Sequence, residues 1–334
     1  MKSIKMNFAY NVIYQMLLII LPLITSPYIS RTLGATGIGI YSYTYSVVYY
    51  FQLFAMLGIS NHGNRSIAAV RDNRLKTSQT FWQIYTIQKI TFVIATCIYL
   101  AYIIFFDNDN VLIALIQTLY LASGLLDISW LFFGLEEFKL TVSRNTIIKI
   151  VTTLMTFIFV RNERDTWKYT LILAAGTCFS QIYLWAYIKK ITDKVKVSFQ
   201  DLKKHIAPIL TLFVPVIAYS IYKVMSKIMI GNMSTYEQVG FYQNAEKIIN
   251  IPTGVITALG TVMLPRMTNL IAQGDNEKAK NYIGVSFKVV TIISAAISFG
   301  LIAIAEVFTP IFFGDGYEEC IILIRLLSIR VFFM

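Results

Sequence analysis

The sequence predicts an all-α membrane protein that crosses the bilayer many times. Hydrophobic residues make up 56% of the 334 residues, only 14% are charged, and the mean hydropathy is +0.62. A soluble chain carries about 25% charged residues, so this chain has too few to cover a water-facing surface. The apolar residues also fall in long runs, and a helix needs roughly 20 of them to cross a bilayer.

Ten such runs can be read along the chain. The first is not read as a cleaved signal peptide, because no small-residue cleavage site follows Lys2 and Lys5 and the run continues to Ile29. The predicted spans cover residues 11–30, 40–59, 84–106, 111–133, 143–160, 169–188, 207–230, 239–264, 285–309 and 320–334.

The charges between the spans predict how the chain is oriented. If the N-terminus is cytoplasmic, the inner connections and their margins carry 17 lysine and arginine residues. The outer connections are assigned five, namely Arg31, Arg161, Arg164, Lys168 and Lys247. Because cytoplasmic loops are enriched in basic residues, we expect a multi-pass protein of the cytoplasmic (inner) membrane with its N-terminus inside. This asymmetry explains most of the net charge of +11 without a nucleic acid partner.

The two halves of the chain resemble each other. Paired prolines interrupt the first and the seventh span, and further matches follow at offsets of 193 to 202 residues. Broken spans at corresponding positions of two halves are typical of a transporter binding site. The matched positions are Pro22 with Pro215, Gly34 with Gly231, Gly58 with Gly260, and Arg65 with Arg266.

This repeat predicts a duplicated six-helix unit. We expect an N-terminal six-helix bundle over residues 1–190, a basic cytoplasmic linker over 191–206, and a partial C-terminal bundle over 207–334. The second unit would hold four of its six helices, because the chain stops at Met334 inside a hydrophobic run.

Polar residues recur at spacings of three, four and seven in several spans, which places them on one helix face. In a bilayer such a face must meet protein or a watery cavity, although polar residues also join helices and tyrosines also anchor at interfaces. We expect a central cationic cavity that favours anions, with Arg31, Lys223 and Lys227 as its cations. The other candidate lining residues are Gln15, Ser26, Tyr41, Tyr45, Tyr49, Gln52, Tyr219, Tyr222, Gln243, Glu246 and Asn250.

Other charges also fall inside the spans. Asp127 is the candidate for proton or sodium coupling, since intramembrane acids are rare and often functional; the alternative is an ion pair at a helix end. The charges of Lys89, Lys149, Lys288 and Glu306 are expected to reach the interface along their side chains.

The sequence contains few residues in patterns typical of catalysis. The two histidines, His62 and His205, fall in predicted inner loops, where a solvated side chain is expected. The three cysteines lie far apart in apolar runs without metal-ligand spacing. There is no nucleophile elbow, phosphate-binding glycine loop or metal-ligand cluster. We therefore expect neither an enzyme nor a bound metal or cofactor.

Four stretches resemble the Wzx-type oligosaccharide flippases, in the polysaccharide-export branch of the multidrug/oligosaccharidyl-lipid/polysaccharide superfamily. They are Asn7 to Tyr14 with Pro22 and Ile29–Tyr41; Gly58–Arg65; Asp127–Phe138; and Phe213–Pro215 with Gly240–Tyr242, Ala245–Lys247 and Leu264–Arg266. The resemblance implies two MATE-like six-helix bundles around a cavity that opens to one side at a time. It also implies a polyprenyl-diphosphate-linked oligosaccharide, the repeat unit of an O-antigen or capsule, as substrate. Coupling to a proton or sodium gradient is part of this expectation, with the lipid bilayer and other polysaccharide-assembly proteins as partners.

Two other functions stay open at this point. A drug/cation antiporter of the same superfamily would favour an anionic cavity, whereas these spans contain more cations. A membrane-embedded polysaccharide polymerase or glycosyltransferase would need a large outer loop with catalytic groups. The longest outer connections, near 107–110, 161–168 and 231–238, are short.

Overall fold

The computed structural model describes residues 4–106, 109–273 and 275–333; the side chains of residues 4–19, Phe106 and several residues between 255 and 276 lie outside this description. Every regular element in the described part is helical, which confirms the all-α class. The elements are α1 (Ile4–Met56), α2 (Ile59–Ala68), α3 (Arg74–Phe106), α4 (Val111–Leu126), α5 (Ser129–Gly134), α6 (Phe138–Phe159), the 3₁₀ turn η1 (Glu163–Asp165), α7 (Thr166–Ile191), α8 (Phe199–Met233), α9 (Tyr236–Ala272), α10 (Asn276–Phe313) and α11 (Glu319–Phe332).

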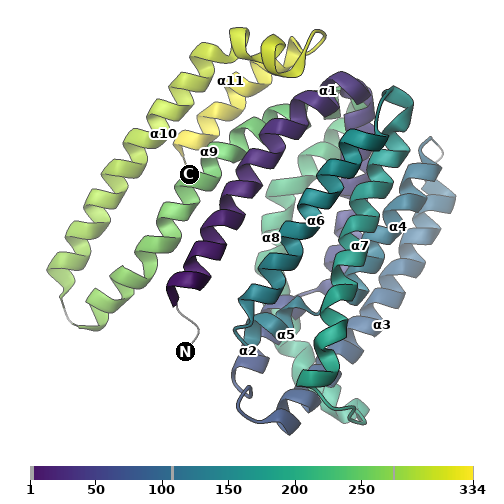
Figure 1. The fold of residues 1–334 in the computed structure, drawn as a ribbon, viewed down its shortest axis with the longest axis vertical. Helices are drawn as coiled ribbons and strands as arrows, with labels where there is room; N and C mark the ends of the chain where they lie inside the picture. The colour runs from purple at the N-terminus through teal and green to yellow at the C-terminus, as the bar shows by residue number, and fades with distance from the viewer. Residues whose placement is uncertain (1–3, 107–108, 274, 334) are drawn as a thin grey trace.

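The long helices lie in two groups (Figure 1). The first group contains α3, α4, α6 and α7, with the short α2 and α5 at its lower end. The second contains α9, α10 and α11, and α1 packs against α9 as well as against α3 and α4. Helix α8 contacts α1, α2 and α3 in addition to α9. The division at residues 1–190 and 207–334 therefore stays a prediction, because α8 packs on both halves.

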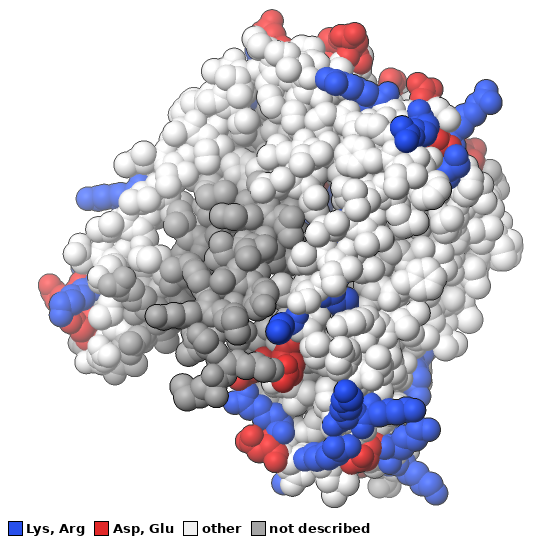
Figure 2. Space-filling model, viewed as in Figure 1, with Lys and Arg blue, Asp and Glu red and all other residues white. Residues whose placement is uncertain are grey.

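The helix surfaces are suited to lipid. Six helical segments of the described residues are long and apolar enough to cross a membrane, and helices also cover the other four predicted spans. Most charged side chains gather at the two ends of the molecule, and the surface between them is largely apolar (Figure 2). These features are those of a multi-pass membrane protein. The six segments are Arg74–Phe105, Val111–Gly134, Phe138–Phe159, Glu163–Ile191, Phe199–Met233 and Glu277–Phe313.

The two ends of this band, called the basic end and the opposite end below, consist of different elements. The basic end contains α2 and the connection 192–198 between α7 and α8, and it lies at the bottom of Figure 1. The opposite end contains the middle of α1, η1 and the connection 314–318 between α10 and α11.

Gly34 turns the chain within α1. Its backbone has φ 67° and ψ 174°, in the left-handed region that glycine adopts at little cost. The expected connection between the first two spans is therefore absent, since one residue redirects the helix. Helical hydrogen bonding continues on both sides of the kink, so few backbone groups lose their partners.

The two helix groups meet backbone to backbone beyond this kink. A Cβ atom at Gly39 would lie 1.6 Å from the carbonyl oxygen of Tyr236, and one at Gly240 would lie 1.9 Å from that of Ala35. Gly39 and Gly240 are 201 residues apart, and so are Ala35 and Tyr236. The same offset separates Arg65 from Arg266. The sequence repeat thus corresponds to a reciprocal contact between α1 and α9.

The predicted span 111–133 is broken at Asp127. The carboxylate oxygen Oδ1 of Asp127 accepts a hydrogen bond from the Ser129 amide at 2.9 Å. Gln88 Nε2 donates to the carbonyl oxygens of Gly124 at 2.7 Å and of Asp127 at 2.9 Å. A helix break at membrane depth is tolerated where protein groups satisfy the freed backbone atoms. Asp127 thus has a capping role, and its role in ion coupling stays a prediction.

The two histidines lie in helices rather than in solvated loops, which corrects the expectation. His62 on α2 and His205 near the start of α8 are both buried. The distance from His62 Nε2 to His205 Nδ1 is 2.8 Å, and His205 Nε2 lies 3.1 Å from Gln83 Oε1. The pair forms because α2 packs on α8, a tertiary contact that local sequence does not reveal.

Acidification is expected to destabilise this contact. Burial lowers the pKa of His62, so the folded protein keeps the ring neutral while the unfolded chain binds a proton more readily. The contribution of His62 is complete above about pH 6.5 and decreases as the pH falls below that value. Thermal unfolding between about pH 8 and pH 5 measures the effect, which should shrink in His62→Gln. Equal pH dependence of the parent and His62→Gln would contradict this interpretation.

Candidate functional site

Charged side chains of α8, α9 and α11 gather at membrane depth, with Arg330 in the last turn of α11. We use the name charged strip for Lys223, Lys227, Glu246, Asn250 and Arg330. At 1.5 Å per helical residue they lie about 9 to 21 Å from the helix ends at the opposite end. This depth is within a hydrocarbon core of about 30 Å, where charges are rare and usually functional.

An ion pair forms the centre of the charged strip. Lys227 Nζ lies 2.8 Å from Glu246 Oε2, and the two side chains are only 12% and 6% exposed. Both residues were predicted to line a cavity, and the structure brings them together. The pair joins α8 to α9. The Glu246 carboxylate compensates the charge of Lys227, which was expected to make the cavity cationic.

The other two cations of the charged strip have no such compensation. Arg330 Nη2 donates to Asn250 Oδ1 at 3.2 Å, and its guanidinium lies 5.4 Å from the ring centre of Tyr222. Lys223 Nζ lies 5.7 Å from the ring centre of Tyr219. Among the described residues neither cation forms an ion pair with a carboxylate. With three cations and one acid, the charged strip favours anions.

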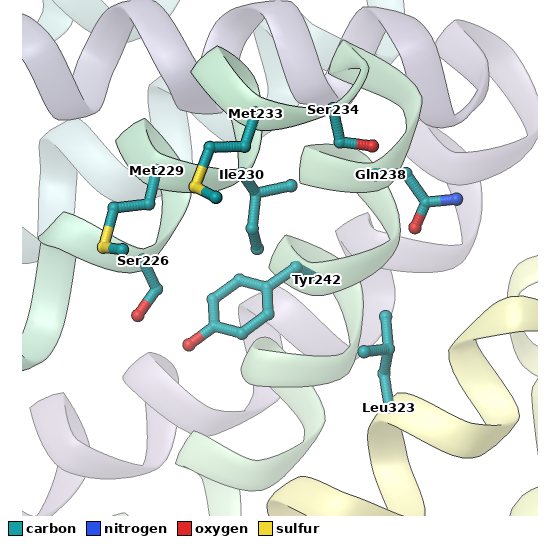
Figure 3. Close-up of a pocket in the computed structure, with 8 residues that line it drawn as sticks. All are labelled: Ser226, Met229, Ile230, Met233, Ser234, Gln238, Tyr242 and Leu323. Carbon is teal, nitrogen blue, oxygen red and sulfur yellow. The ribbon is translucent and has the colours of Figure 1, made fainter.

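A cavity of about 520 Å³ adjoins the charged strip (Figure 3). The hydroxyl of Tyr242 faces Ser226 in this cavity and interacts electrostatically with Glu246 and Arg330. Tyr242 therefore connects the cavity to the charged strip. Such a mixture of apolar walls and a few polar groups suits a ligand with both kinds of surface. The lining residues are Ser226, Met229, Ile230, Met233, Ser234, Gln238, Tyr242 and Leu323.

Exposed tyrosines extend the charged strip toward α1. Tyr219 and Tyr222 are 60% and 51% exposed. Tyr49 of α1 is close enough to Tyr219 for an electrostatic interaction, and the Tyr50 hydroxyl donates to the Ser220 carbonyl oxygen at 3.3 Å. The predicted residues Tyr49, Tyr219 and Tyr222 thus lie on adjoining surfaces of α1 and α8.

Tyr41 and Tyr45 lie in a different cavity. It measures about 200 Å³ and is lined by α1 together with α4, α6 and α7 of the first group. The Tyr45 hydroxyl donates to that of Tyr120 at 3.1 Å. Although both residues share a polar face with Tyr49, the structure assigns them to the interior of the first group.

Arg31 is separate from the two lysines with which it was grouped. Its Nη2 atom donates to the carbonyl oxygen of Ile311 at 2.7 Å, and its side chain contacts Gly314 after α10. These contacts are at the opposite end. Arg31 therefore links α1 to the end of α10 through this hydrogen bond.

The remaining candidates are dispersed. Ser26 is buried on α1, and the side chain of Gln52 contacts Gly124 inside the first group. Gln243 is half-buried on α9. The side chain of Gln15 lies outside the described residues.

Comparison with known proteins identifies the family. The model of a family described as polysaccharide biosynthesis protein matches residues 4–271. The chain belongs to this family. Two curated relatives, from Escherichia coli (strain K12) and Shigella dysenteriae, both carry the name "Putative O-antigen transporter". The first is 25% identical over 331 residues, which cover 98% of this chain and 79% of the relative. The second is 24% identical over 302 residues, which cover 89% and 74%. No solved structure matches the chain.

These findings confirm the family that the resemblance predicted. Both relatives bear the name of a transporter rather than of an enzyme, in agreement with the expectation.

Several residues of these sites were not predicted from the sequence. Arg330 and Lys149 lie inside predicted spans, and a charge within a span is the one sequence feature that marks both as candidate site residues. Tyr242 is the repeat counterpart of the candidate Tyr41, so the repeat could have found it. Lys247, assigned to an outer connection, lies inside α9 beside Glu246.

Proposed function

We propose that this protein moves a polyprenyl-diphosphate-linked oligosaccharide repeat unit across the cytoplasmic membrane by alternating access, as a step in surface polysaccharide synthesis. The observation that carries the proposal is the charged strip, with three cations and one acid at membrane depth beside a cavity of mixed polarity. The family and the names of its relatives support the class of cargo.

The charged strip accounts for recognition of the diphosphate. Lys223 and Arg330 have charge that no carboxylate among the described residues compensates, and both residue types bind phosphate oxygens well. Lys227, held in place by Glu246, adds a third cation to the same region. This balance disfavours the cationic cargo of a drug antiporter.

The aromatic surface beside these cations suits the sugars. Tyr219 and Tyr222 are exposed next to Lys223 and Arg330, and tyrosine rings pack against sugar faces while their hydroxyls form hydrogen bonds. The polyprenyl tail would stay among the lipid chains, in contact with the apolar outer faces of the helices.

The contacts at the opposite end support a proposed direction of access. If the N-terminus is cytoplasmic, the contacts of Gly39 with Tyr236 and of Ala35 with Gly240 close the outer side. The conformation described here would then receive substrate from the cytoplasmic side. A proton or sodium gradient is the proposed energy source, with Asp127 as the predicted coupling residue, and other polysaccharide-assembly proteins are proposed partners.

Reconstituted vesicles test this function. The probe is a polyprenyl diphosphate that carries a short N-acetylglucosamine-containing chain, and a lectin added outside measures the sugars that have crossed. We expect the parent protein to accelerate crossing and the double variant Lys223→Ala/Arg330→Ala to lose at least about tenfold of that rate, the equivalent of about 1.4 kcal/mol.

The matched control is Lys89→Ala, which removes an exposed lysine of α3 outside the charged strip. It should transport at the parental rate. Crossing that does not depend on the protein would refute the flippase function. A double variant as active as the control would refute the role of the charged strip.

A further inference from the structure

The smaller cavity inside the first helix group contains a lysine at membrane depth. Lys149 lies at the middle of α6 (Phe138–Phe159), and its side chain lines the cavity of about 200 Å³ between α1, α4, α6 and α7. The expectation that this charge reaches the interface is therefore wrong, because a mid-helix lysine that faces the interior of a bundle has no short route to the headgroups.

Lys149 has no fixed counter-charge in the part of the chain that the structure describes. None of the ion pairs among these residues includes it, and no acidic residue lines the cavity. A half-buried ammonium group without a partner is costly in the middle of a bilayer, so the site favours either a neutral amine or a diffusible anion.

The other polar groups of the cavity present hydrogen-bond donors. Gln117 is 1% exposed, and its amide nitrogen Nε2 has no hydrogen-bond partner among the described residues. Tyr120 accepts the proton of Tyr45, so its own hydroxyl proton is left to donate. A buried amide N–H that nothing satisfies is uncommon and indicates a ligand or water in contact with it.

We propose that this cavity binds a small monovalent anion, with chloride as the physiological ligand. The Lys149 ammonium supplies the charge, and the Gln117 amide and the Tyr120 hydroxyl donate hydrogen bonds. The anion in turn neutralises the lysine, so its binding stabilises the packing of α6 on α1 and α7. This site is separate from the charged strip and does not depend on the identity of the transported substrate.

Thermal unfolding in anions of equal ionic strength tests the proposal. The purified full-length protein in lipid nanodiscs is heated in sodium gluconate or in sodium chloride, each at about 150 mM, where a dissociation constant of about 10 mM would shift the folding equilibrium about 16-fold. We expect a higher unfolding temperature in chloride than in gluconate for the parent protein. The shift should saturate with chloride concentration and should also occur with bromide.

Two variants assign the shift to the site. Lys149→Met should abolish the difference between chloride and gluconate, while Lys89→Met, at the exposed lysine of α3, should keep it. If Lys149→Met does not fold, Gln117→Leu serves instead and should reduce the shift. The proposal is overturned if the parent shows no chloride-specific shift, which would mean a neutral amine, or if both the Lys149 and the Gln117 variants retain the full shift.

Discussion

Replacing Gly240 with alanine is expected to separate α1 from α9 and to abolish transport. The added Cβ atom would lie 1.9 Å from the Ala35 carbonyl oxygen, whereas an ordinary contact needs at least 3.4 Å. Because the obstacle is backbone rather than a flexible side chain, the helices themselves must move. Overpacking of this kind typically costs about 1–3 kcal/mol even where side chains can adjust. The initial rate in the vesicle assay and the unfolding temperature measure the two effects.

Gly300→Ala is the matched control for this substitution. Gly300 lies on α10, and a Cβ atom there meets nothing within 4 Å. The control should keep parental transport and stability. If Gly240→Ala behaved like Gly300→Ala, the close contact between α1 and α9 would have no role.

Glu246→Gln is expected to produce the largest loss of stability among single polar substitutions. It leaves the buried Lys227 ammonium without its counter-charge, and breaking a buried pair from one side costs about 3–5 kcal/mol. Urea or thermal unfolding in nanodiscs measures the loss. The exchanged variant Lys227→Glu/Glu246→Lys restores opposite charges and should recover part of it.

An exposed ion pair provides the comparison. Arg74 on α3 lies 2.8 Å from Asp193 in the connection 192–198 at the basic end, with side chains that are 53% and 59% exposed. Ion pairs exposed to water contribute little to stability, so Asp193→Asn should change stability far less than Glu246→Gln. Equal losses for Glu246→Gln and Asp193→Asn would show that burial of the Lys227 pair has no energetic consequence.

The helices were predictable because the bilayer sets their length. A run of about 20 apolar residues predicts a span without help from the rest of the chain, and helices cover all ten predicted spans in the described residues, apart from short breaks such as that at Asp127. The breaks were less predictable. Gly34 replaces an expected connection with one left-handed residue, and Asp127 interrupts a span because Gln88, distant in sequence, satisfies the exposed carbonyls.

The candidate site was predictable only in part, for a related reason. Periodicity places residues on a helix face but does not say which helix that face meets. Tyr41, Tyr45 and Tyr49 share one face of α1, yet the first two point into the first group and the third lies near Tyr219 of α8. Lys227 and Glu246 were each identified from their own spans, whereas their pairing depends on how α8 packs on α9.

If α9 rotates against α1 during transport, the reciprocal contact at Gly39 and Gly240 places the axis of that rotation near one end of a long helix. From Gly240 to the end of α9 at Ala272 the helix extends about 48 Å at 1.5 Å per residue. A rotation of about 10° at the pivot would sweep the far tip of α9 through about 8 Å, while the atoms at the glycines would move only by fractions of an ångström. The two glycines let the backbones touch at this point, and the length of α9 would turn a slight local rotation there into a displacement as wide as a sugar ring.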